Sequence, residues 1–182
     1  VAIGDNAGTA ITTGDNNVAL GKDALLSTTT AANNVAIGSF SLDANTTGES
    51  NTGIGRNSLT DNIDGTYNTA VGHNSLANNT TADNNTAMGY NALVTNTTGT
   101  NNAAFGCGAL SSTQTTNDNT GIGFDALTVN TGSNNTALGS KAFRGNQTSN
   151  DGVAVGHCAL FTNTTGASNT AVGAFALKLN TT

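Results

Sequence analysis

The chain of 182 residues contains no proline and no tryptophan, and only 9% of its residues are charged and 4% aromatic. An ordinary globular domain carries about 25% charged residues and a larger share of Leu, Ile, Val and Phe. Here Asn, Thr, Ala and Gly together make up more than half of the chain. The scarcity of large apolar residues excludes a compact, irregular enzyme domain with a thick core.

Positive charge is also scarce, since 5 Lys and Arg stand against 11 Asp and Glu for a net charge of −6. Nucleic acid requires clustered positive charge, so we expect no nucleic-acid partner. No apolar run approaches the roughly 20 residues that span a bilayer, so we expect no membrane span in this segment. No signal peptide or initiator Met precedes Val1, and the chain begins within a repeated motif. We therefore expect residues 1–182 to be a single repeat array and a section of a longer fibre.

Cysteine occurs only at Cys107 and Cys158, which is too few for a disulfide framework. The two lie three repeats apart, or about 14 Å along a stack of coils, beyond the roughly 7 Å that a disulfide allows. We interpret both as small buried or half-buried residues. His157 precedes Cys158, but neighbours along a strand point to opposite faces, so we expect no contact between them.

What the chain has instead is a tandem repeat that runs along its whole length. The spacing of one recurring glycine is 17 residues, apart from one step of 16 between Gly123 and Gly139. A disordered low-complexity chain would not keep such a register. The eleven glycines are Gly4, Gly21, Gly38, Gly55, Gly72, Gly89, Gly106, Gly123, Gly139, Gly156 and Gly173.

Two apolar positions recur with each glycine. A large apolar residue stands directly before it, Ala or Gly stands before that residue, and Leu or Phe stands four positions after the glycine in every copy but the first. The short Thr/Val-Ala-Ile/Val segment suits a strand, and the Asn/Thr/Gly tract that closes each copy is typical of turns. Seventeen residues are too few for a helical-hairpin repeat, which takes about 34.

These features predict an all-β fold, a parallel β-solenoid of eleven 17-residue coils. One coil cannot bury its own apolar face, whereas stacked coils can. We expect two apolar ladders inside the rod, and the 16-residue step falls in a loop where it leaves both in register. The first predicted core ladder contains Ile37, Ile54, Val71, Met88, Phe105 and Ile122, and the second contains Leu42, Leu59, Leu76, Leu93, Leu110 and Leu127.

The motif Asn-Val-Ala-Ile-Gly-x-x-Ser at residues 34–41 resembles the head repeat of YadA-like trimeric autotransporter adhesins. Residues 68–75 match it similarly, and the resemblance extends over all eleven copies. It is also similar to repeats of phage tail-fibre shafts. The resemblance implies a left-handed β-roll, three chains side by side, and a place on a cell or virion surface. Family head repeats are nearer 14 residues, whereas this unit has 17 and a long Asn/Thr loop.

The sequence offers no constellation for catalysis. It has no nucleophile elbow, no His-Glu-x-x-His and no Cys-x-x-Cys. The carboxylates are scattered, and His73 and His157 lie five coils apart. We therefore expect no enzyme activity, no catalytic residues, no metal and no cofactor.

Asn-x-Ser/Thr sequons give a second hypothesis. Six of them stand seven residues after the repeat glycine, where we expect an exposed loop along one edge of the rod. One interpretation is a row of glycans on an extracellular fibre. The other is that Asn-Thr-Thr is a good turn and ladder sequence. The candidate glycosylation sites are Asn45, Asn79, Asn96, Asn146, Asn163 and Asn180.

Two functions follow as expectations. The first is a structural, adhesive fibre of stacked β-coils, extracellular on a cell surface or virion, which provides a stiff rod for display and attachment. The second is a carbohydrate- or receptor-binding module that uses the exposed Asn/Thr-rich loops. The expected partners are further copies of the chain, as a homotrimer or an end-to-end filament, and a ligand on a host surface or a glycan.

Overall fold

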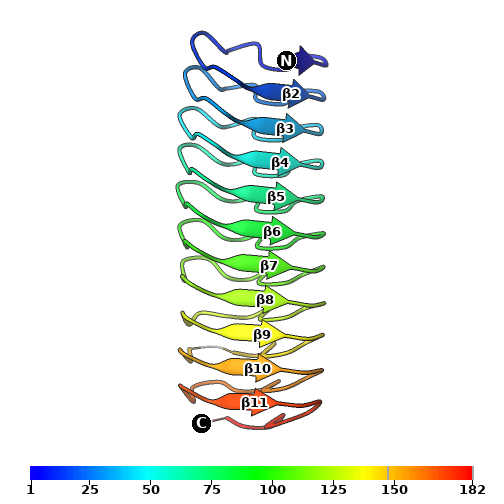
Figure 1. Ribbon diagram of the computed structural model, residues 1–182, viewed down its shortest axis with the longest axis vertical. Coiled ribbons are helices and arrows are strands. Elements are labelled where there is room, and N and C mark those ends of the chain that lie inside the picture. Colours follow the sequence, from blue (N-terminus) through cyan, green and yellow to red (C-terminus); the bar gives the residue numbers. More distant parts are fainter. Residues whose placement is uncertain (147, 182) are drawn as a thin grey trace.

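A computed structural model describes residues 1–146 and 148–181. The described chain forms one sheet of eleven parallel strands that follow each other in sequence order, one per coil, and stack into a rod (Figure 1). The predicted β-solenoid is thereby confirmed. The strands are β1 (Ala2–Ile3), β2 (Val18–Leu20), β3 (Val35–Ile37), β4 (Thr52–Ile54), β5 (Thr69–Val71), β6 (Thr86–Met88), β7 (Ala103–Phe105), β8 (Thr120–Ile122), β9 (Thr136–Leu138), β10 (Val153–Val155) and β11 (Thr170–Val172).

The register of the sheet follows the repeat. Ala36 of β3 pairs with Gly53 of β4, and every later strand pairs at the same repeat positions. Across the 16-residue step, Ile122 still pairs with Leu138. The missing residue is therefore absorbed in the loop, as the sequence predicts.

Two columns of side chains pack together and form the thin interior of the rod. One is the column of Leu residues four positions after each glycine, of which Leu42, Leu59, Leu76, Leu93, Leu110 and Leu127 are completely buried. The other consists of the small residues at the centre of each strand, such as Ala70 and Ala87. The second predicted core ladder is therefore confirmed.

The first predicted core ladder is wrong. Side chains alternate between the two faces of a strand, and in each of the three-residue strands β2 to β11 the central Ala or Gly faces inward. The residues on either side of it must then face outward. Ile54, Met88 and Ile122 are 37%, 41% and 39% exposed, and Ile37, Val71 and Phe105 are half-buried.

Two backbone features shape each coil. The repeat glycine has φ between 122° and 137°, and a Cβ at Gly72 would lie 2.6 Å from the carbonyl oxygen of Gly89 in the next coil. The buried Leu also has positive φ, for example 50° at Leu93. That conformation costs a residue with a Cβ about 1–2 kcal/mol. Burial of the Leu side chain, which contributes about 1.5–3 kcal/mol, offsets this cost.

Candidate binding surfaces

The outer face of the sheet is the first candidate surface. It presents two columns along the rod: the large apolar residues before each glycine, and the Val, Thr or Ala residues at the start of each strand. Of the large residues, Leu20 and Leu138 are also exposed, at 42% and 46%. Because the strands stack in register (Figure 1), the apolar column is continuous from coil to coil. We call these two columns the outer face.

The two edges of the outer face differ in charge. The edge that precedes the strands carries exposed carboxylates and no Lys or Arg at the positions five and six residues before each glycine: Asp15, Glu49, Asp118 and Asp151. The edge that follows the strands carries Lys22, Arg56 and Lys141 together with Asp5, Asp23 and Asp125. The outer face therefore lies between a purely acidic edge and one of mixed charge.

Aromatic and cationic side chains stack along the mixed edge. The rings of His73 and Tyr90 are parallel with centroids 5.6 Å apart, and Arg56 Nη1 lies 3.3 Å from His73 Nε2. Lys141 Nζ lies 5.9 Å from the centroid of the Phe124 ring. These contacts join successive coils at the rod surface.

Two columns of Asn side chains occupy the interior beside the apolar layer. The turn column stands seven residues after each glycine. Within it, Asn79 Nδ2 donates both to Asn62 Oδ1 of the preceding coil at 2.7 Å and to the Ala82 carbonyl of its own turn at 3.0 Å. The opening column stands at the start of each motif. There, Asn51 Oδ1 accepts the N–H of Asn68 in the next coil at 2.9 Å. Both columns satisfy backbone groups that a thin interior cannot hydrate.

The turn column contains the candidate glycosylation sites, and its burial corrects their expected exposure. Asn45, Asn79, Asn96, Asn146 and Asn163 are completely buried, and Asn180 is half-buried. A buried amide that is hydrogen-bonded from coil to coil does not present its nitrogen for glycan attachment. The interpretation as turn and ladder sequence therefore describes these residues. Among the remaining sequons, Asn78, Asn84 and Asn134 are exposed.

Few groups in the described residues have the chemistry of a reactive site. No group of three or more His, Cys, Asp or Glu residues there is placed to hold a metal ion. Both cysteines are free; Cys158 is buried as expected, whereas Cys107 is exposed. His157 Nε2 does contact Cys158 Sγ at 3.4 Å, contrary to expectation, because Cys158 lies in a turn with φ of 54° instead of an extended strand. Burial raises the pKa of Asp43, against which the hydrogen bond from Thr60 acts.

The turn column is interrupted at Thr113. The Thr113 side chain is completely buried and its hydroxyl has no hydrogen-bond partner, nor has Oδ1 of Asn96 in the preceding coil. These are the two buried side-chain polar atoms without a partner in the described part of the chain. The sequence places Thr113 where most coils have Asn. Only the burial of the turn column shows that this difference leaves polar atoms without a hydrogen-bond partner.

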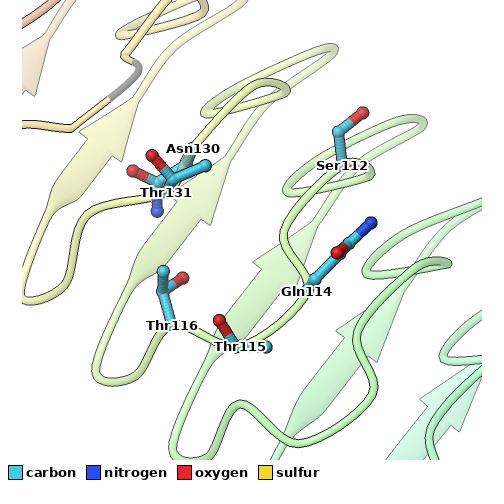
Figure 2. Close-up of a pocket in the computed structure, with 6 residues that line it drawn as sticks. All are labelled: Ser112, Gln114, Thr115, Thr116, Asn130 and Thr131. Atoms are coloured by element: carbon cyan, nitrogen blue, oxygen red, sulfur yellow. The ribbon is translucent and has the colours of Figure 1, made fainter.

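A hollow of about 230 Å³ lies beside the 16-residue coil (Figure 2). It opens between the coil that contains Gly106 and the shortened coil that contains Gly123. Sequence reasoning missed it, although the 16-residue spacing marks its place. Its lining residues are all polar and uncharged: Ser112, Gln114, Thr115, Thr116, Asn130 and Thr131.

No family model matches this sequence, and comparisons with curated proteins and with solved structures find no similar protein. Among the described residues, no helix is long and apolar enough to cross a membrane.

Proposed function

We propose that this protein is a structural, adhesive fibre that works outside the cell and associates with further copies of itself through the outer face. The observation that carries the proposal is the continuous column of exposed and half-buried apolar side chains on a regularly hydrogen-bonded sheet. An unbroken rod suits length, stiffness and display.

The size of the outer face supports a second copy of the chain as its occupant. Eleven strands at about 4.8 Å give a strip roughly 50 Å long. Monomeric proteins rarely expose contiguous apolar patches larger than a few hundred Å². With its flanking edges, a strip of this length approaches the roughly 800 Å² per partner of a standard interface.

The charges at the edges support chains that run in the same direction. When two parallel rods turn their outer faces toward each other, the edge that precedes the strands of one meets the edge that follows the strands of the other. The carboxylates of Asp15 and Glu49 then approach the side that carries Lys22 and Arg56. Antiparallel rods would bring the two acidic edges together, and like charges in contact are unfavourable. A parallel homotrimer, the number that the family resemblance implies, meets this condition.

The test measures the oligomeric state of the purified chain. We expect sedimentation equilibrium to give a multiple of 18.0 kDa and electron micrographs to show straight rods. The double variant Met88→Asp and Ile122→Asp places two charges on the outer face, and we expect it to be monomeric with an unchanged circular dichroism spectrum. Asn78→Asp with Thr81→Asp adds the same charge at exposed loop positions and serves as the control.

A parent chain that stays monomeric over its whole accessible concentration range would contradict the interface. Adhesion is tested separately with beads coated with the parent chain, which we expect to attach to host-cell surfaces that uncoated beads leave free. The alternative function, a carbohydrate-binding module, is favoured by one observation, the polar hollow, and that site is argued below.

A further inference from the structure

We propose that the hollow beside Thr113 binds a neutral, hydroxyl-rich ligand of the size of one sugar ring. This inference names a site and a ligand class for the alternative function. It is independent of self-association through the outer face, because the hollow lies among the loops.

The hollow arises where three departures from the repeat meet. The coil containing Gly123 is one residue short, Thr113 replaces the Asn of the turn column, and the lining residues follow directly on either side. In the regular turn at Asn45, Nδ2 bonds to the Gly48 carbonyl, three residues on. In the short turn, Asn130 Nδ2 bonds to the Gly132 carbonyl, only two residues on. The turn of the shortened coil is therefore tighter than the regular turn, and the hollow lies beside it.

Backbone hydrogen-bond donors beside the hollow have no backbone partner. In the preceding coil, the backbone N–H groups of Thr97 and Thr98 both donate to the Gln114 carbonyl, at 2.9 and 3.3 Å. The equivalent N–H groups of Gln114 and Thr115 donate to no backbone carbonyl in the described chain. The buried amide of Asn130 also uses only one of its two N–H groups. The N–H groups of Gln114 and Thr115 therefore remain for a ligand in the hollow, whereas the coils containing Gly4, Gly38, Gly55, Gly72 and Gly89 use the equivalent groups to bond the next coil. The coil containing Gly21 also leaves the equivalent N–H groups of Thr29 and Thr30 without a backbone carbonyl, but the hollow lies at Gln114 and Thr115.

The lining decides the class of ligand. The Thr116 hydroxyl and Asn130 Oδ1 already accept hydrogen bonds from Asn119 Nδ2 and Asn146 Nδ2. The hydroxyls of Ser112, Thr115 and Thr131 and the amide of Gln114 remain to offer both donors and acceptors. None of the six residues is charged, and a chain of net charge −6 repels anions at long range. About 230 Å³ corresponds to roughly seven or eight waters at about 30 Å³ each. It lies below the roughly 300–1,000 Å³ of pockets for drug-sized ligands. A single neutral sugar ring has this size and the required mixture of donors and acceptors.

The test is a titration of the full chain, labelled with ¹⁵N, with D-glucose, D-galactose, N-acetylglucosamine and glycerol. We expect at least one sugar to produce saturable shifts of the backbone amide signals of Gln114 and Thr115, with no such shifts at Thr97 and Thr98. The proposal is overturned if no probe gives saturable shifts in the millimolar range. It is also overturned if the signals of both coils move together.

Two variants distinguish specific binding in the hollow from nonspecific binding elsewhere on the rod. Insertion of one Thr after Thr131 restores a 17-residue coil and should close the hollow, so we expect saturable binding to vanish while thermal stability stays equal or rises. Thr131→Val keeps the coil length and removes one lining hydroxyl. We expect this variant to raise the dissociation constant about tenfold, equivalent to about 1.4 kcal/mol. The control Thr98→Val, in the preceding coil, should leave binding unchanged. Retained binding in the insertion variant would overturn the site.

The same samples distinguish this proposal from the fibre proposal. The insertion variant should keep the oligomeric state of the parent, and the Met88→Asp and Ile122→Asp variant should keep its sugar binding. Failure of one property in the parent therefore leaves the other measurable.

Discussion

Thr28 and Thr113 occupy the same position of the turn column, and both are completely buried, yet only one is satisfied. The Thr28 hydroxyl donates to the Asn45 carbonyl at 3.0 Å and lies 3.4 Å from Asn45 Nδ2. The Thr113 hydroxyl has no partner. The coil after Thr28 has a full-length turn, whereas the turn at Asn130 is one residue short. The polar column thus depends on equal coil length as much as on residue type.

The apolar layer behaves differently at the same step. Leu93, Leu110 and Leu127 are completely buried on both sides of it, and the strands keep their register. Apolar contacts have no required direction, so they tolerate a small shift of a loop that hydrogen bonds do not. The following predictions test this contrast.

The largest effect is expected in the apolar layer. Leu93→Asp and Leu127→Asp should each unfold neighbouring coils, because an unpaired charge in a thin interior costs several kcal/mol. The two variants should lose the same amount of stability if the apolar layer continues unbroken across the 16-residue coil. Thermal unfolding followed by circular dichroism measures both, and Ile54→Asp on the outer face is the control that should still fold. A stable Leu93→Asp variant would show that the Leu column is not the core.

Breaking the polar column in its regular part should cost less. Asn79→Ala removes two donated hydrogen bonds and the one it accepts from Asn96 at 3.2 Å. Each buried group left without a partner costs about 1–3 kcal/mol. Chemical denaturation should show this loss for Asn79→Ala, whereas Asn78→Ala, at the exposed neighbour, should change stability by less than about 0.5 kcal/mol. Equal effects at the two positions would argue against a buried column.

Completing the column should give a smaller effect of opposite sign. Thr113→Asn offers a donor to Asn96 Oδ1, and we expect a gain of about 1 kcal/mol, typical of one net hydrogen bond. Thr28→Asn is the matched control; it should gain less, because the Thr28 hydroxyl already has partners. Comparison of the two denaturation midpoints shows whether the gain in stability is larger at Thr113. A larger gain at Thr28 would mean that the unpaired atoms do not limit stability.

The smallest effect concerns Asp43, whose pKa burial raises above its ordinary value of 3.8. A carboxyl group with a raised pKa in the folded state stabilises the fold most at acid pH, below its unfolded pKa, and this contribution is lost as the pH rises through the folded pKa. Asp43→Asn should therefore be slightly more stable than the parent at neutral pH. Thermal melts of the parent and of Asp43→Asn across this pH range should show the difference in stability disappear in acid.

The sequence predicted the architecture because the solenoid repeats one local rule. A glycine at constant spacing, with Leu four residues later, is sufficient to identify parallel coils and one buried column. It did not identify the inward side of the strand, because alternation only says that Ala70 and Val71 face opposite ways. The larger residue was assigned to the interior. In a rod this thin, the interior takes the small residue and the large one faces outward.

Which Asn and Thr side chains are buried also depends on the tertiary structure. Asn45 and Asn78 both begin sequons, and only the folding of the loop decides that Asn45 is buried and Asn78 exposed. By itself the sequence determined the coil, its register and the place of the irregular step, because these follow from spacing along the chain. The tertiary structure decided which faces are buried, where the polar columns run and that the irregular step opens a hollow. Burial and hydrogen-bond satisfaction depend on neighbouring coils that lie 17 residues away.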